Sequence, residues 1–144
     1  MSDLASLEKL ARSNAQLPVD VYFDEALLAR ETEQLFERGP RYAGHSLMVP
    51  NQGDYATLPW ENDGRVLVRN AQGLSLISNV CRHRQAKMLA GRGNASNIIC
   101  PLHRWTYDLK GELIGAPHFA DTPCMNLSRF ELQHWNGLLF DQNG

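Results

Sequence analysis

The sequence lacks the marks of several common protein classes. No apolar run approaches the roughly 20 residues that a membrane-spanning helix needs, and no stretch is repeated or of low complexity. The pair Gly91-x-Gly93 has no strand-to-helix context, so it does not predict a phosphate-binding loop. A net charge of −2 gives no indication of nucleic-acid binding. We therefore expect no membrane and no nucleic acid among the partners.

Cysteine is scarce as well. The 144 residues, enough for one domain with one modest core, include only Cys81, Cys100 and Cys124. The first eight residues have neither the basic nor the apolar region of a signal peptide, which indicates a cytoplasmic protein whose thiols stay reduced. Because three is an odd number and the first two have a histidine nearby, we interpret Cys124 as a structural or free thiol.

Two short stretches each combine one thiol with one imidazole. The first is Cys81-x-His83 and the second is Cys100-x-x-His103, with sixteen residues between His83 and Cys100. Thiolates and imidazoles suit zinc or an iron–sulfur cluster, whereas magnesium and calcium prefer oxygen ligands. Zinc fingers usually pair like ligands, while mixed pairs suit a two-iron cluster with both cysteines on one iron and both histidines on the other. A zinc site and four unrelated residues remain the alternatives.

The segment from Cys81 to Tyr107 resembles the Rieske [2Fe–2S] motif, in the version of the α-subunits of Rieske non-haem iron (ring-hydroxylating) oxygenases. That family typically reads Cys-Arg-His-Arg-Gly and later Cys-Pro-Tyr-His-Gly-Trp-x-Tyr. The matching residues are Cys81, Arg82, His83, Arg84, Gly93, Asn94, Cys100, Pro101, His103, Trp105 and Tyr107. The chain departs from the pattern at Gln85, Leu102 and Arg104, none of which is an expected ligand.

The resemblance implies a set of site residues and a function. The implied ligands of a [2Fe–2S] cluster are Cys81, His83, Cys100 and His103, with Arg84, Trp105 and Tyr107 beside them. The implied function is electron transfer from a reductase or ferredoxin to a mononuclear Fe(II) that activates O2, as in dioxygenases of aromatic hydrocarbon catabolism. A stand-alone Rieske ferredoxin is the alternative, and a zinc-stabilised binding module is a third possibility.

The mononuclear iron of such an oxygenase needs two histidines and one carboxylate. The spare histidines, His45, His118 and His134, lie far apart and form no paired motif. We therefore expect the iron in a catalytic domain absent from this chain. By the resemblance, that domain belongs to the same or a neighbouring α-subunit of a trimer. His45 is expected to pack or to cap a turn.

The remaining pattern predicts a mainly β fold after a helical leader. Helices are expected over 2–13 and Glu25–Arg38, the second with Asp24 as N-cap and Gly39-Pro40 as stop signal. Short strands are expected at 46–49, 55–58, 65–69, 74–78, 105–107, 112–114, 130–135 and 138–140. Their spacing predicts an antiparallel barrel or sandwich, and the resemblance makes it a Rieske-type fold with cluster-binding loops. We expect the leader to cover 1–40 and the Rieske domain 41–144.

Charge is uneven around the motif. Between Cys81 and Tyr107 there are five bases and no acid. The bases are Arg82, Arg84, Lys87, Arg92 and Arg104. They form either an ordinary solvated loop surface or a positive collar that steers an acidic redox partner.

Overall fold

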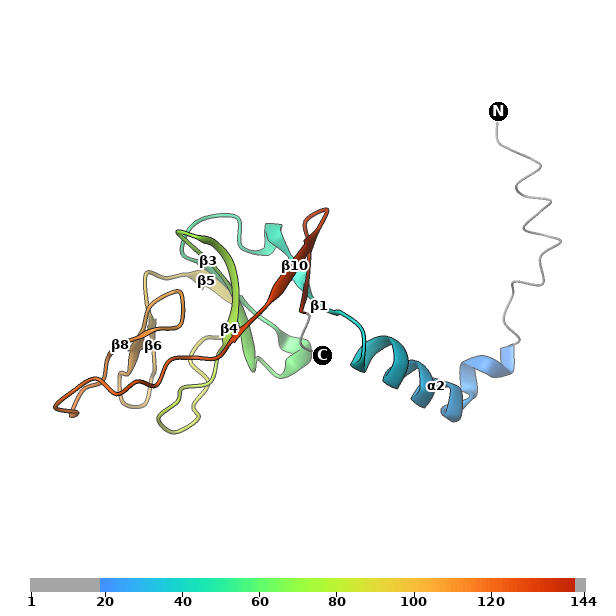
Figure 1. Cartoon of the computed structure of the whole chain (residues 1–144), viewed down its shortest axis with the longest axis horizontal. Coiled ribbons are helices and arrows are strands. Elements are labelled where there is room, and N and C mark those ends of the chain that lie inside the picture. Colours follow the sequence, from blue (N-terminus) through green and yellow to red (C-terminus); the bar gives the residue numbers. More distant parts are fainter. Residues whose placement is uncertain (1–18, 142–144) are drawn as a thin grey trace, which may run out of the picture. The chain divides into compact units, whose positions relative to one another are not determined.

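The structure is a computed structural model that describes residues 19–141. The chain divides into two compact units, Met1–Arg38 and Gly39–Gly144. In the described residues the first unit is helical and the second is built mainly of strands (Figure 1). The helix predicted over residues 2–13 lies outside the described residues.

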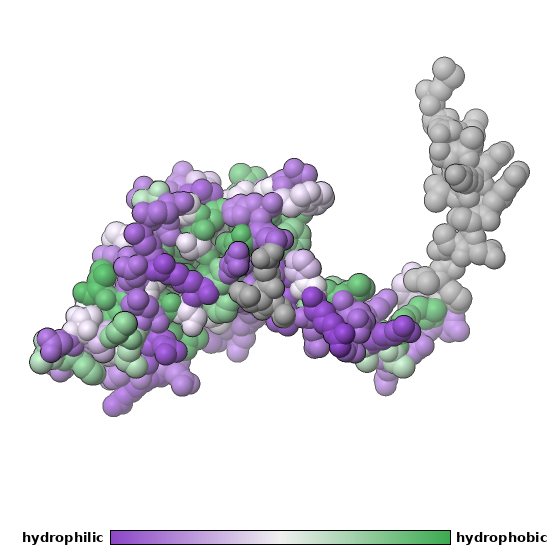
Figure 2. All heavy atoms as spheres, viewed as in Figure 1, coloured by the Kyte–Doolittle hydropathy of each residue, from purple (hydrophilic) through white to green (hydrophobic). Residues whose placement is uncertain are grey.

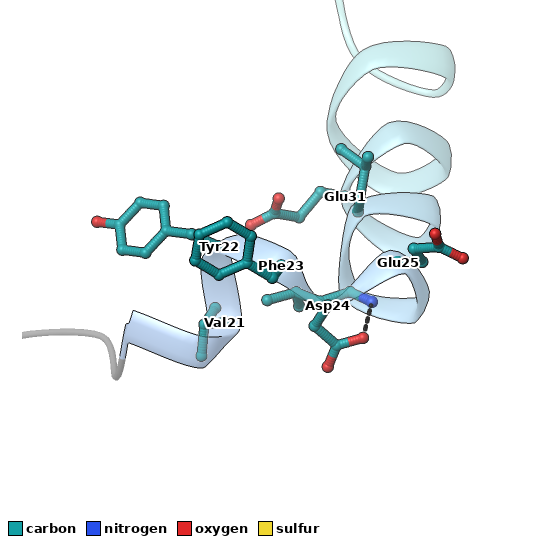
Figure 3. A pocket seen from close by; sticks show the side chains of 8 residues that line it. Val21, Tyr22, Phe23, Asp24, Glu25 and Glu31 are labelled. Carbon is teal, nitrogen blue, oxygen red and sulfur yellow. Dashed lines mark hydrogen bonds between the residues drawn. The ribbon is translucent and has the colours of Figure 1, made fainter.

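Within residues 19–38, the first unit contains three consecutive helical segments. They are a 3-10 helix (Val19–Phe23), α2 (Glu25–Glu31) and a π-helical segment (Thr32–Glu37). The Asp24 carboxylate accepts hydrogen bonds from the backbone N–H groups of Ala26 (2.9 Å) and Leu27 (3.1 Å), and Figure 3 draws the second. This is the geometry of an N-cap, so the N-cap predicted at Asp24 is confirmed. The helical run ends at Glu37, just before the predicted stop.

This helical unit keeps many apolar side chains exposed. Tyr22, Phe23 and Leu28 are all largely exposed, and they line a pocket between the 3-10 helix and α2 (Figure 3). Hydrophilic residues prevail on the visible side of α2, with hydrophobic ones at its margin (Figure 2). No residue of the three helical segments is buried. Helices this short are only marginally stable in water unless an apolar face is packed. The apolar side chains of this amphipathic unit are exposed rather than packed.

The second unit contains three antiparallel sheets within the described residues. The strands are β1 (Arg41–His45), β2 (Asp54–Thr57), β3 (Arg65–Asn70), β4 (Gly73–Ser78), β5 (Arg92–Asn94), β6 (Ile98–Ile99), β7 (Thr106–Tyr107), β8 (Leu113–Gly115), β9 (Arg129–Phe130), β10 (Leu132–Trp135) and β11 (Leu138–Asp141). The strand orders are β1-β11-β10, β5-β2-β3-β4-β9 and β6-β7-β8 (Figure 1). The predicted fold class, mainly β and antiparallel, is confirmed.

One predicted strand is wrong. Residues 46–49 do not pair; Ser46–Met48 forms a 3-10 helix, and the paired strand β1 lies just before it. The cause is local, because Nδ1 of His45 accepts a hydrogen bond from the Leu47 N–H (3.1 Å) and caps the turn. The capping role expected of His45 is confirmed. A second 3-10 helix spans Pro59–Glu61.

The turn between β10 and β11 agrees with its sequence. Asn136 (φ 48°) and Gly137 (φ 85°) both adopt left-handed conformations between β10 and β11, as a two-residue hairpin of the Asn-Gly type requires. Val66, Leu67 and Val68 of β3 are all fully buried, which means that both faces of the central sheet are covered.

The alternation of β3 divides the core in two. Val66 and Val68 pack with the cysteines of the two predicted ligand loops, while Leu67 packs in a separate cluster with Leu139 of β11. Side chains of a strand point alternately to opposite faces, so β3 separates the two clusters. The central sheet is therefore the platform under the ligand loops.

Candidate metal centre

The two predicted ligand stretches form two loops with the same backbone pattern. In each, the cysteine carbonyl accepts a hydrogen bond from the N–H four residues on, which belongs to Gln85 (2.9 Å) after Cys81 and to Arg104 (3.0 Å) after Cys100. Each cysteine N–H in turn donates to the carbonyl five residues on, at 2.9 and 2.8 Å. Two unrelated stretches of sequence thus present their cysteines in the same way.

The loops bring the four predicted ligands into one place. Cys81 and Cys100 are each 1% exposed and belong to the same core cluster. The rings of His83 and His103 meet edge to face with centroids 4.7 Å apart. Within the described residues, Nδ1 of each ring is buried and has no hydrogen-bond partner. Leaving a buried polar atom unpaired costs about 1–3 kcal/mol, so a group bonded to both nitrogens would remove that cost.

Local electrostatics act differently on the imidazole and on the thiol. Partial burial lowers the pKa of His83, and the neighbouring His103 and Arg84 lower it further, which keeps the imidazole neutral. Burial raises the pKa of the Cys100 thiol and Cys81 adds to this, while the backbone N–H groups of Leu102 and His103 oppose it. Without a metal the raised pKa favours the neutral Cys100 thiol, so a bound cation such as iron would be needed to hold it as the thiolate.

These residues fit a two-iron cluster. The donor set divides into two sulfurs and two imidazole nitrogens, as a Rieske centre needs with cysteines on one iron and histidines on the other. Among residues 19–141, no three His, Cys, Asp or Glu side chains converge on a single ion position. Ligands that share two irons have no need to do so. The spare histidines are dispersed, with His118 and His134 exposed.

Two predicted neighbours of the ligands, Tyr107 and Trp105, contact them directly, and the third, Arg84, lies close enough to lower the pKa of His83. The Tyr107 hydroxyl is 3.6 Å from Sγ of Cys81 and accepts a hydrogen bond from the Arg82 N–H (3.2 Å). The Trp105 ring stacks on His83 with centroids 4.8 Å apart and an interplanar angle of 8°. Its indole Nε1 is also buried without a partner among the described residues. A hydroxyl this near to Sγ of Cys81 would be placed to donate toward the sulfur of a bound cluster and so to tune its potential.

The departures from the family pattern at Gln85 and Arg104 fall at equivalent places. Each follows its cysteine by four residues and has a left-handed backbone, with φ of 57° and 60°. A side chain in that region costs about 1–2 kcal/mol, which glycine avoids. The family's usual glycines are thus explained by backbone geometry, and this chain accepts strain at both positions.

That strain predicts stabilising substitutions. Gln85→Gly and Arg104→Gly should each raise the free energy of unfolding of the iron-loaded protein by about 0.5–1 kcal/mol, the strain relieved less the extra entropy of an unfolded glycine. Urea unfolding measures this. Ala90→Gly is the matched control, because Ala90 has no positive φ, and it should destabilise the protein. Loss of stability in all three variants would refute the strain.

Asn79 is a buried residue that the sequence did not single out. Its Nδ2 donates to the carbonyls of Asp63 (2.9 Å) and Leu89 (2.8 Å), and its Oδ1 accepts from the Leu89 N–H (2.9 Å). It therefore ties the end of the first ligand loop to the turn before β3. An asparagine just before Cys81 and just after an apolar strand was the available signal, but its distant partners were not visible in the sequence.

Removing this amide should loosen the first loop. Asn79→Ala takes away the partner of three backbone groups in a half-buried region, and we expect a loss of about 2–3 kcal/mol of folding free energy. Asn94→Ala is the matched control, because the Asn94 amide also makes two hydrogen bonds but is exposed to water. It should cost about 1 kcal/mol or less. Equal losses for the two variants in urea unfolding would contradict this role.

The surface around the loops is basic. The five predicted collar residues are all exposed: Arg82, Arg84, Lys87, Arg92 and Arg104. Cys124 is exposed and forms no disulfide bond. Of the helices in residues 19–141, none has the length and apolar character to cross a membrane.

Comparison with known proteins agrees with this geometry. Residues 40–127 match the family described as "Rieske [2Fe-2S] domain". The chain is 66% identical, over 98% of its length, to putrescine 2-hydroxylase of Ralstonia nicotianae, and 51% identical over 98% to that of Bordetella bronchiseptica. Its fold superposes on naphthalene 1,2-dioxygenase from Rhodococcus sp. with a TM-score of 0.70 at 25% identity, over 98% of this chain and 34% of that one.

The chain therefore belongs to the Rieske [2Fe-2S] domain family, and it is related to the α-subunits of Rieske oxygenases. Such a domain carries a [2Fe–2S] cluster. The chain spans 39% and 36% of the length of the two putrescine 2-hydroxylases. The finer expectation of an aromatic-ring dioxygenase is not supported by these relatives, whose names describe hydroxylation of an aliphatic diamine.

Proposed function

We propose that this chain is the electron-transfer part of a Rieske oxygenase α-subunit, and that Cys81, His83, Cys100 and His103 hold its cluster. The observation that carries the assignment is the pair of buried, unpartnered Nδ1 atoms beside two buried thiols. When bound, a [2Fe–2S] cluster supplies a site that takes up and releases one electron. The chain's own residues keep the imidazoles neutral, hold the sulfurs away from water and leave the histidine side nearer the surface.

The electron comes from a reductase or ferredoxin and goes to a mononuclear Fe(II) that activates O2. That iron lies in a catalytic domain outside this chain, in the same or a neighbouring α-subunit of a trimer. The exposed bases around the ligand loops support docking of an acidic electron donor. On this proposal the helical leader covers residues 1–40, the Rieske domain covers 41–144, and the protein works in the cytoplasm.

The proposed reaction of the whole protein is hydroxylation of an aliphatic amine such as putrescine. Two relatives with this named activity share 66% and 51% of their aligned residues with the chain, across nearly all of it. An electron-transfer domain must match both its donor and its own catalytic domain, so similarity over 98% of the chain supports the same enzyme type.

The test uses the full-length α-subunit with its reductase. With putrescine we expect O2 uptake and a product that carries one added oxygen atom by mass spectrometry, and with naphthalene we expect neither. The 144-residue chain alone should accept one electron from dithionite and hydroxylate nothing. Turnover of naphthalene but not putrescine would overturn the substrate proposal. Substrate oxidation by the short chain alone would overturn the electron-transfer role.

A further inference from the structure

An aromatic side chain outside both ligand loops packs on one of the two histidines. Phe119 follows β8, and its ring meets His83 edge to face with centroids 6.0 Å apart and an interplanar angle of 89°. The same ring meets Trp105 at 5.3 Å and 82°. Trp105 in turn stacks on His83, so the two aromatic rings and the imidazole form one contact group. We call this group the His83 aromatic shell.

A tight turn brings Phe119 to this position. The Phe119 N–H donates to the carbonyl of Ala116 (3.2 Å), and His118 between them has a left-handed φ of 72°. Pro117 precedes His118, so the segment has the form of a type II turn, with proline first and the positive φ second. Further on, the N–H of buried Leu127 donates to the carbonyl of Gly111 (2.8 Å) and fixes the other end. The segment from Ala116 to Leu127 is thus anchored at both ends.

The two histidines differ in what surrounds them. His83 contacts three rings, those of His103, Trp105 and Phe119. Among the described residues, His103 has one aromatic contact, which is His83 itself. Phe119 is 48% exposed, so one side covers His83 and Trp105 while the other meets solvent. The aromatic shell therefore restrains and covers one imidazole and leaves the other free of it.

We propose that Phe119 is a positioning residue that orients His83 toward the cluster and sets the access of water to that side of it. This inference rests on the proposed function, since it concerns the imidazole that we assign as a ligand. Edge-to-face ring contacts hold a ring's orientation, and the apolar surroundings of a cluster control its hydration and potential. Reduction adds negative charge, which water stabilises, so loss of the cover raises the potential.

The test compares three substitutions at Phe119 in the iron-loaded protein. Phe119→Tyr keeps the ring and should leave the midpoint potential unchanged. Phe119→Leu and Phe119→Ala should shift it upward, with alanine giving the larger shift. Pulsed EPR of the reduced protein should show that one of the two histidine nitrogen couplings changes while the other stays. Trp135→Ala removes another exposed aromatic side chain, on β10, and is the matched control with no expected change.

Phe119→Leu keeps the inference falsifiable even where Phe119→Ala fails to fold. Full iron content with an unchanged potential and both nitrogen couplings unchanged in the leucine variant would overturn the role of Phe119. The unsubstituted protein separates this outcome from failure of the ligand assignment. Two histidine nitrogen couplings there support the assignment whatever the Phe119 variants do, and their absence refutes the assignment itself.

Discussion

Cys100→Ser is expected to remove the iron–sulfur chromophore from the protein. In the proposed assignment its thiolate is one of two sulfur ligands, and a hydroxyl is a poor substitute for the soft donor that iron–sulfur clusters require. The variant should lose nearly all of its visible absorbance and its bound iron. Metal content and the absorption spectrum of protein purified without air measure both.

The same variant should also lose stability. The two loops contact each other through the rings of His83 and His103. A cluster on the proposed ligands would join the loops, so its loss would leave two buried imidazole nitrogens and one thiol without a partner. We expect a clearly lower melting temperature. Cys124→Ser is the matched control, because Cys124 is exposed, and it should keep both the colour and the melting temperature. Full iron content in Cys100→Ser would refute the assignment of this ligand.

Arg65→Met is expected to have the largest effect on stability outside the metal centre. The Arg65 guanidinium pairs with Glu61 on the short helix after β2, at 2.6 Å from Nε to Oε2, and also with Asp141 at the end of β11. Asp141 is 1% exposed. The guanidinium also lies over the Phe130 ring, 4.7 Å from its centroid. One side chain thus connects β3, β9 and β11.

Breaking a buried ion pair by removing one partner typically costs about 3–5 kcal/mol, because a buried charge loses its counterion. For Arg65→Met we expect about 3 kcal/mol, since methionine keeps most of the apolar stem but the buried Asp141 carboxylate loses its ion pair with the guanidinium. Arg129→Met is the matched control. It breaks the ion pair with Glu112, in which the two side chains are 50% and 51% exposed.

An exposed pair of this kind contributes about 0–1 kcal/mol, so the control should lose that much or less. Urea unfolding of both variants at the same salt concentration separates the two cases. The Arg65 effect should also persist at high salt, because screening acts weakly on a buried pair. Equal small losses of stability in the two variants would show that the Arg65 interactions do not connect β11 with β3.

Short-range patterns in the sequence predicted much of this structure. The Asp24 cap, the Asn136-Gly137 hairpin and the mainly β class all follow from residues next to one another, and the structure confirms them. The strand predicted at 46–49 is wrong because the prediction used apolar patterning alone. The interaction that decides this segment is a histidine cap, which such a pattern does not reveal.

Contacts between residues far apart in the sequence were not predicted, because local patterns carry no information on them. Arg65 and Asp141 are 76 positions apart, and no local pattern links them. Phe119 lies between the strands predicted at 112–114 and 130–135, and no local pattern relates it to His83. The four ligand residues were predicted because two loops repeat the same donors at short spacing. The buried thiols and the unpartnered imidazole nitrogens support their assignment as ligands, and a measurement on the metal itself tests it.

That measurement is the iron and sulfide content of the purified chain together with pulsed EPR after reduction by dithionite. The account predicts two irons and two inorganic sulfides per chain, and hyperfine coupling of the reduced centre to two histidine nitrogens, those of His83 and His103. One zinc without sulfide, or an iron–sulfur signal with no histidine nitrogen coupled to it, would contradict the assignment of Cys81, His83, Cys100 and His103 as the ligands of a Rieske cluster.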